Sequence, residues 1–160
     1  MDKKVCKKIY VVNYIEICNK QNICINKGEN MLDLKDDIIL ATNARTRAYV
    51  KYTPYTVGAT LKTKSGKRYT GCNIQNHAIQ STCAERVAFL KALSEGETEF
   101  ESITVIGGPK DETPEQCLPC GYCRQFMSEF VDDDFKIYTV YNQKVEAYVL
   151  KELLPHSFKF

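Results

Sequence analysis

Two short cysteine-containing segments place the strongest constraint on how this chain folds. Residues 82–86 read TCAER, and residues 119–125 read PCGYCRQ. Together they supply three thiols, those of Cys83, Cys120 and Cys123, that can converge on one metal ion. A zinc ion with three protein ligands keeps a fourth position for water, which distinguishes a catalytic zinc site from a structural one. Glu85 is then a candidate for moving protons to and from that water.

The predicted local structure of both segments favours a common metal site. Cys120 and Cys123 occupy positions i and i+3 in the first turn of a helix expected over 120–131, so both sulfurs face the same side. Cys83 opens a second helix, expected over 83–93. Because helix N-termini carry partial positive charge, both helix starts stabilise thiolates. If the two starts point to one place, the three thiolates meet there.

Charge counting at such a site requires a nearby cation. A zinc ion with three thiolates has a net charge of −1, which weakens its ability to acidify water. Arg86 and Arg124 each lie close enough to a ligand cysteine in the sequence to bond to its sulfur. We expect Arg86 to offset the negative charge in this way.

A fourth cysteine leaves a competing interpretation open. Cys117 extends the second segment to Cys-x-x-Cys-x-x-Cys, a spacing that also serves iron–sulfur clusters. With Cys83 it could instead close a four-sulfur structural zinc site, which makes the chain a non-catalytic metal-binding module. Neither arrangement gives Glu85 a role. The two histidines, His77 and His156, lack ligand spacing and are expected at the surface or in packing.

Helix and strand patterns alternate along the chain and predict an α/β fold, a three-layer α/β/α sandwich. Further expectations are a buried helix stripe of Leu34, Ile38, Ala41 and Ala48, and a helix cap at Ser81 or Thr82. Residues 1–31 are expected to form an N-terminal extension, either a hairpin or disordered, before a single domain over 32–160. The expected helices cover 32–50, 83–93 and 120–131, and the expected strands cover 56–62, 68–74, 102–107, 135–141 and 145–150.

Composition argues against nucleic-acid and membrane partners. The net charge is only +2, and the lysines and arginines are scattered along the chain. No apolar run approaches the roughly 18 residues that a membrane span needs. We read no export signal at the start, because Lys7, Lys8 and Glu16 interrupt the first segment. The eight cysteines are therefore expected in a reducing, cytoplasmic environment, where clustered thiols indicate a metal or catalysis.

Both cysteine segments resemble those of the zinc-dependent cytidine deaminases that act on free nucleosides, of the three-cysteine, homotetrameric type. The family pattern is Cys-Ala-Glu-Arg followed by Pro-Cys-Gly-x-Cys-Arg-Gln, and the resemblance runs from about residue 34 to 158. It implies a mixed sheet of about five strands and one zinc ion per subunit, held by Cys83, Cys120 and Cys123. It also implies a homotetramer with shared active sites. The implied reaction is hydrolytic deamination of cytidine or deoxycytidine in pyrimidine salvage, with Glu85 moving protons.

The same resemblance assigns four substrate-binding residues. Asn73 matches a family residue that binds the ribose, whereas Gln75 replaces the usual glutamate of that segment. An amide still accepts a hydrogen bond from a hydroxyl, but this bond is weaker than a charge-assisted one by about 1 kcal/mol. Tyr55 stands where a phenylalanine commonly lines the base pocket. Phe158 resembles a C-terminal phenylalanine that reaches a neighbouring subunit's site and stacks on the pyrimidine.

Two further deaminase activities compete with cytidine deamination. Gln75 leaves room for another aminopyrimidine nucleoside, such as blasticidin S. A polynucleotide-editing deaminase is disfavoured, because such enzymes usually place histidine where Cys83 stands and no basic groove is evident. The choice between ribose and deoxyribose stays open.

Overall fold

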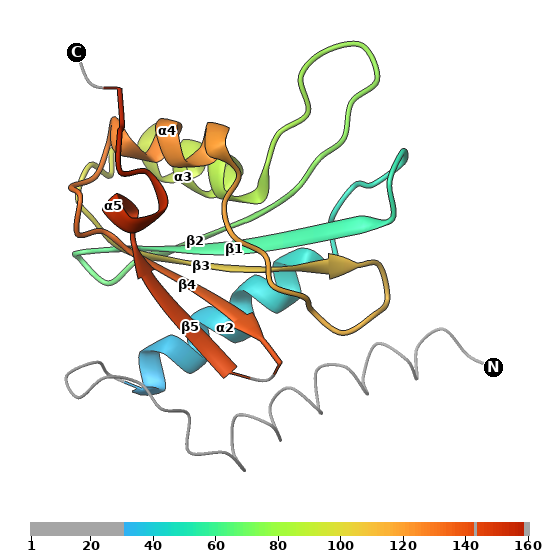
Figure 1. Ribbon diagram of the computed structural model, residues 1–160, viewed down its shortest axis with the longest axis horizontal. Coiled ribbons are helices and arrows are strands. Elements are labelled where there is room, and N and C mark those ends of the chain that lie inside the picture. The colour runs from blue at the N-terminus through green and yellow to red at the C-terminus, as the bar shows by residue number, and fades with distance from the viewer. Residues whose placement is uncertain (1–30, 143, 159–160) are drawn as a thin grey trace.

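The computed structural model describes residues 31–142 and 144–158, in which five strands form one mixed sheet with helices on both faces (Figure 1). The strand order is β2-β1-β3-β4-β5, and only β3 and β4 pair in parallel. The expected three-layer α/β/α architecture and the expected mixed sheet are confirmed. The elements are α2 (Met31–Arg45), β1 (Tyr55–Thr63), β2 (Arg68–Cys72), α3 (Ala84–Ser94), β3 (Phe100–Pro109), α4 (Gly121–Ser128), β4 (Lys136–Tyr141), β5 (Lys144–Val149) and α5 (Leu150–Leu153).

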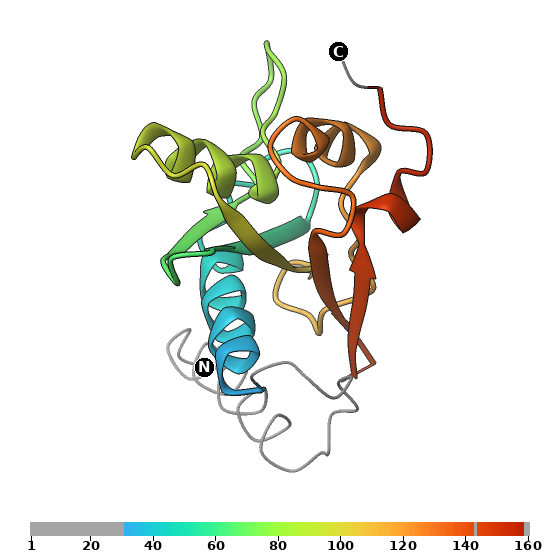
Figure 2. The same cartoon turned by 90° about the vertical axis from the view of Figure 1, so that its left-hand side faces the viewer.

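Helix α2 covers one face of the sheet (Figures 1 and 2). Three members of its expected buried stripe, Leu34, Ile38 and Ala41, lie in a core cluster with side chains of β3 and β4. Gly58 of β1 lets the helix approach closely, because a Cβ atom there would lie 2.0 Å from the Ala41 carbonyl oxygen. The apolar spacing in the sequence therefore placed this layer correctly.

The end of α2 corrects the sequence-based expectation. The helix stops at Arg45 and not at residue 50, so Ala48 lies beyond the helix and is partly exposed. The reason is that Tyr49 pairs with the segment after β2. Its N–H donates to the Asn73 carbonyl, and its carbonyl accepts the Gln75 N–H. These two bonds replace the helical bonds that a longer α2 would make.

Helices α3 and α4 lie on the opposite face of the sheet (Figure 2). Ala84, Ala88 and Phe89 of α3 and Met127 of α4 are fully buried in the larger core cluster. Gly71 of β2 allows this contact, since a Cβ atom there would lie 2.2 Å from the Ala84 carbonyl oxygen. The two helices that begin at the cysteine segments are thus packed side by side on one surface.

The start of α3 differs from the expected cap. The N-cap residue is Cys83, which makes no side-chain capping bond, and neither Ser81 nor Thr82 takes that role. Thr82 is held in an extended conformation, because it exchanges both backbone hydrogen bonds with Ile74 in an antiparallel bridge. The bridge fixes the point at which the chain enters the helix.

Several other boundaries shift by a few residues. Strand β3 extends to Pro109 because it pairs with β1 as far as Tyr55. Helix α4 ends at Ser128, and the next N–H groups bond three residues back, which tightens the chain into a closing turn. The expected N-terminal extension lies outside the described residues, apart from Met31 at the start of α2. In the described part of the chain, no helix has the length and apolar character that crossing a membrane requires.

Candidate metal centre

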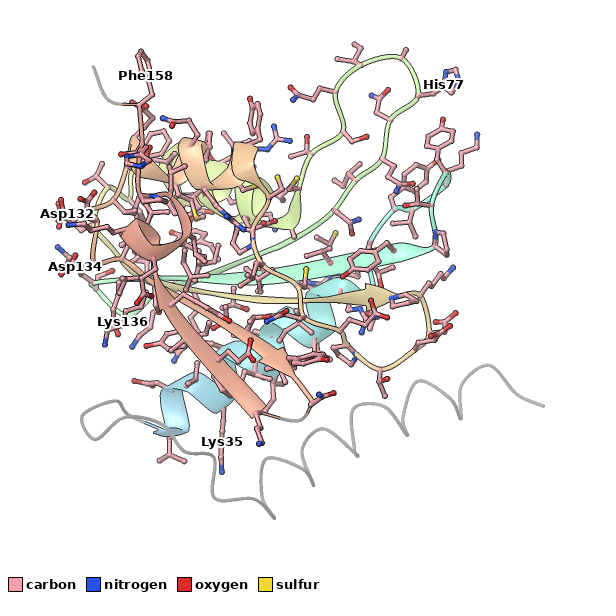
Figure 3. The ribbon with its side chains drawn as sticks, in the orientation of Figure 1. Lys35, His77, Asp132, Asp134, Lys136 and Phe158 are labelled. Atoms are coloured by element: carbon pink, nitrogen blue, oxygen red, sulfur yellow. The ribbon has the colours of Figure 1, made fainter. Side chains whose placement is uncertain are left out.

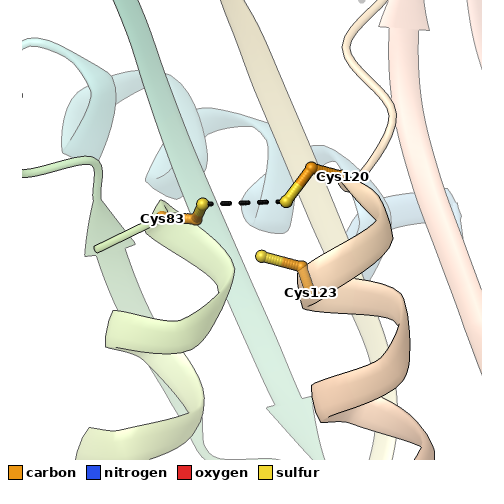
Figure 4. A group of neighbouring side chains, drawn as sticks. All are labelled: Cys83, Cys120 and Cys123. Carbon is orange, nitrogen blue, oxygen red and sulfur yellow. Dashed lines mark hydrogen bonds between the residues drawn. The ribbon is translucent and has the colours of Figure 1, made fainter. Parts of the chain in front are cut away.

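Three sulfur atoms meet where α3 and α4 begin (Figure 4). The Sγ atoms of Cys83, Cys120 and Cys123 all lie within 4.8 Å of one another, and those of Cys83 and Cys120 are 3.9 Å apart. Tetrahedral zinc ligands at about 2.3 Å from the metal lie about 3.8 Å from each other. The donor type, number and spacing therefore fit one zinc ion.

The backbone at this point supports negatively charged sulfurs. Cys83 and Cys120 are the N-cap residues of α3 and α4, with extended backbone angles, and neither side chain caps its own helix. Both helix starts carry partial positive charge and face the cluster. The pKa of Cys83 is lowered to about 5, because its thiolate accepts hydrogen bonds from the Cys123 thiol and from Arg86. A thiolate is the form that binds metal.

Glu85 lies in the first turn of α3 and is only 4% exposed. The pKa of its carboxyl group is raised to about 7, chiefly by burial and in smaller part by the nearby Cys83 thiolate. Hydrogen bonds from its own backbone N–H and the Cys123 thiol oppose this rise. A carboxyl group in this setting both accepts and donates protons near neutral pH. The structure thus places a buried carboxyl group with a near-neutral pKa beside Cys83 and Cys123.

The two candidate arginines have different partners. Arg86 Nη2 lies 3.9 Å from Cys83 Sγ and donates to the Ser81 carbonyl at 2.8 Å. Arg124 instead donates to the carbonyl oxygens of Pro119, at 2.6 Å, and Leu153, at 2.8 Å. Arg86 is therefore the cation in position to offset the charge of a ligand sulfur, and Arg124 ties α4 to α5.

Cys117 stands apart from the cluster. Among the described residues, the group able to hold a metal contains only Cys83, Cys120 and Cys123. Cys117 is buried beneath Gly107, and its thiol interacts with the Tyr55 hydroxyl; burial raises the pKa of Cys117 to about 12. The four-sulfur and iron–sulfur alternatives lack their fourth ligand in this geometry.

Asn73 and Gln75 use their amide groups within the protein. Asn73 Oδ1 accepts the Val57 N–H at 2.8 Å, and its Nδ2 donates to the Tyr55 carbonyl at 2.9 Å. Gln75 Oε1 accepts two backbone N–H groups, from Tyr52 at 2.8 Å and Thr53 at 3.1 Å. Its Nε2 donates to the Thr53 hydroxyl. An amide oxygen has two lone pairs, so that of Gln75 is saturated, while each side chain keeps one further N–H.

The two aromatic residues expected at the substrate lie in different settings. Tyr55 is half-buried against the core cluster on the α3 side. Phe158 is 61% exposed, and Figure 3 shows it at the outer edge of the C-terminal tail. Its backbone is held by Gln125 of α4, which accepts the Phe158 N–H at 3.0 Å and donates to the Phe158 carbonyl at 2.6 Å. His77 and His156 are exposed, as expected.

Sequence reasoning missed two residues that organise this region. Gln125 fixes the tail, although its place in the motif gave no sign of that contact. Tyr122 places its ring over Arg86, with the Cζ atom 4.2 Å from the ring centroid. An aromatic residue between the second and third ligand cysteines, with an arginine three residues after the first, is a signal that could have suggested this pair.

Comparison with known proteins gives a consistent result. Residues 34–139 match the family model described as the cytidine and deoxycytidylate deaminase zinc-binding region. A cytidine deaminase from Sporosarcina psychrophila is 38% identical over 129 residues, which span 79% of this chain and 92% of that protein. The crystal structure of cytidine deaminase from Burkholderia pseudomallei superimposes with a TM-score of 0.69 at 36% identity, covering 77% of this chain and 97% of that chain. A blasticidin-S deaminase from Bacillus cereus is 29% identical over 107 residues, or 64% of this chain and 76% of that protein.

Proposed function

Since this chain belongs to the cytidine and deoxycytidylate deaminase family, we propose that it hydrolyses cytidine or deoxycytidine to the corresponding uridine and ammonia. The observation that carries this proposal is the cluster of three sulfurs within 4.8 Å, with the buried Glu85 two residues after the first ligand. A thiol cluster alone fits many metal sites. The adjacent carboxyl group, which no ligand role requires, is what makes it a site for hydrolysis.

Cys83, Cys120 and Cys123 hold one zinc ion per subunit in this proposal. Zinc with three protein ligands supplies a Lewis-acid position that lowers the pKa of water. Arg86 lies against Cys83 Sγ and offsets part of the excess negative charge of the three thiolates.

Glu85 moves the protons. Its carboxylate takes a proton from the attacking water and delivers it to the ring nitrogen N3 as the water oxygen bonds to C4. The same carboxyl group then carries the second proton to the amino group, the bond from C4 to that nitrogen breaks, and ammonia leaves. Burial on α3 keeps Glu85 away from bulk water, so its protons are exchanged with the reacting groups.

The substrate contacts are part of the proposal. Asn73 and Gln75 each have one N–H beyond those used within the protein, and these donate to sugar hydroxyl oxygens. Tyr55, which is half-buried against the core, lines the base pocket. Phe158, whose backbone is anchored and whose side chain is exposed, extends to the site of a neighbouring subunit.

That last role requires an oligomer with shared sites, and we propose a homotetramer. Light scattering at assay concentration should give four times the monomer mass, and a fully active monomer would refute the shared site. Five thiols, those of Cys72, Cys83, Cys117, Cys120 and Cys123, are free in the described part of the chain. They favour a reducing compartment, and we place the protein in the cytoplasm, in pyrimidine salvage.

The decisive experiment separates chemistry from metal binding. Glu85→Gln should retain one zinc ion per chain, measured by elemental analysis, while ammonia release from cytidine falls at least about 100-fold. Glu112→Gln, an exposed glutamate away from the cluster, is the matched control and should keep full activity. Substantial turnover by the Glu85 variant removes this residue from the mechanism. If the protein releases ammonia from blasticidin S and none from cytidine, then blasticidin S replaces cytidine as the proposed substrate.

A further inference from the structure

One aromatic contact joins the starts of the two helices that carry the cysteines. The Tyr122 ring lies over the Arg86 guanidinium, with Cζ 4.2 Å from the ring centroid. This is well within the roughly 6 Å over which a ring attracts a cation electrostatically. Arg86 belongs to the first turn of α3 and Tyr122 to the first turn of α4. The pair therefore connects the segment of Cys83 with the segment of the other two cysteines.

The atoms of Arg86 show why the ring matters. Nη2 serves two acceptors, the Ser81 carbonyl and Cys83 Sγ. Nε is buried and has no hydrogen-bond partner among the described residues. An electron-rich ring face over the guanidinium compensates a buried N–H group of this kind. Since the guanidinium is planar, the ring also fixes the plane in which Nη2 points at the sulfur.

Within the described part of the chain, the Tyr122 side chain makes no polar contact that competes with the stacking on Arg86. Tyr122 is 52% exposed, and its hydroxyl makes no hydrogen bond within residues 31–142 and 144–158. The ring face, and not the hydroxyl, is thus the part that the structure uses. Phenylalanine should serve equally well at this position, whereas leucine should not.

We propose that Tyr122 is a positioning residue that holds the Arg86 guanidinium against Cys83 Sγ and thereby stabilises the three-thiolate metal site. The inference rests on the proposed zinc site and does not require that cytidine is the substrate. Without the ring, water reaches Arg86, the contact with the sulfur weakens, and the excess negative charge on the thiolates is less well balanced.

The experiment measures zinc release from the holoprotein to the chromophoric chelator 4-(2-pyridylazo)resorcinol. Tyr122→Leu should release zinc about threefold to tenfold faster than the unmodified protein, and Tyr122→Phe should release it at the unmodified rate. Tyr141→Leu is the control for loss of an exposed tyrosine away from the cluster. With Co²⁺ in place of zinc, the thiolate-to-metal absorption band should move to longer wavelength in Tyr122→Leu only, because a thiolate without its hydrogen bond is more easily oxidised.

A double-mutant cycle tests whether Tyr122 acts through Arg86. In an Arg86→Gln background, Tyr122→Leu should change zinc release by less than about 1.5-fold, because the partner is already absent. Independent, multiplying effects would overturn the proposal, and so would an unmodified release rate in Tyr122→Leu. A raised KM with unchanged zinc release would assign Tyr122 to substrate binding and also overturn it. Zinc release is measured without substrate, so failure of the proposed reaction and failure of this inference give different results.

Discussion

Replacing Gly71 by alanine should damage the metal site from a distance. The added Cβ would lie 2.2 Å from the Ala84 carbonyl oxygen, 2.7 Å from the Ala88 nitrogen and 2.9 Å from the Val87 Cβ. Ordinary contact begins at 3.4 Å, so the backbone of α3 must move away from β2 by about 1 Å. Overpacking typically costs about 1–3 kcal/mol, and the close contact with two backbone atoms of α3 puts this case at about 3 kcal/mol. Most of the protein remains folded, since typical stabilities are about 5–15 kcal/mol.

The displaced helix carries Cys83 and Glu85 with it. A shift of about 1 Å is large beside the 3.9 Å that separates the Cys83 and Cys120 sulfurs, so zinc retention should fall together with stability. Urea unfolding measures the free energy of unfolding, and elemental analysis of the folded fraction after gel filtration measures zinc per chain. The reasoning predicts that both quantities drop.

Gly58→Ala is the matched control on the other face of the sheet. Its Cβ would lie 2.0 Å from the Ala41 carbonyl oxygen and 2.5 Å from the Arg45 nitrogen, so the steric conflict with α2 is equally severe. Because α2 carries none of the three cysteines, this variant should lose similar stability yet keep one zinc per folded chain. Equal zinc loss in both variants, or a Gly71→Ala protein with unchanged zinc and stability, would refute the argument.

Two further predictions concern polar groups away from the sulfurs. The hydroxyls of Thr60 and Thr104, paired residues of β1 and β3, are buried without a hydrogen-bond partner in the described residues, so Thr→Val at either position should be neutral or stabilise by up to about 1 kcal/mol. A lower urea midpoint would contradict this and indicate a buried water on the hydroxyls. Gln75→Glu should lower the KM for cytidine about fivefold at unchanged kcat, because a carboxylate satisfies Tyr52 and Thr53 and still has acceptor sites for a sugar hydroxyl. An unchanged KM would mean that residue 75 does not contact the sugar.

The parts of the molecule that follow from local sequence were predictable. The spacing of Cys120 and Cys123, and the offset of Glu85 from Cys83, are properties of single helical turns. The structure brings the three sulfurs together and gives Glu85 interactions with Cys83 and Cys123. Apolar spacing similarly identified the buried face of α2. Such patterns depend on residues three or four apart, which the helix itself places on one side.

Features that depend on distant partners were not predictable in the same way. The end of α2 is decided by Tyr49 pairing with the segment after β2, and nothing near Tyr49 in the sequence encodes that partner. Likewise, Gln75 has its oxygen saturated by the backbone of Tyr52 and Thr53, a contact across more than 20 residues. The glutamine at position 75 therefore indicates that a hydrogen bond of the motif differs, but only the fold shows that Tyr52 and Thr53 are its partners.

The way the two helices begin explains why fold and metal site depend on each other. Helices usually start with Ser, Thr, Asp or Asn, whose side chains satisfy a free N–H and contribute about 1 kcal/mol. Here both starts have cysteine at the N-cap without a side-chain capping bond, which leaves the sulfurs directed at each other. Three neighbouring thiolates repel, so the arrangement is favourable only with nearby positive charge from the helix termini, Arg86 and a bound cation. Both helices therefore lack the stabilising cap of their first turn, and in its place they present a cluster of sulfur donors that a metal ion stabilises.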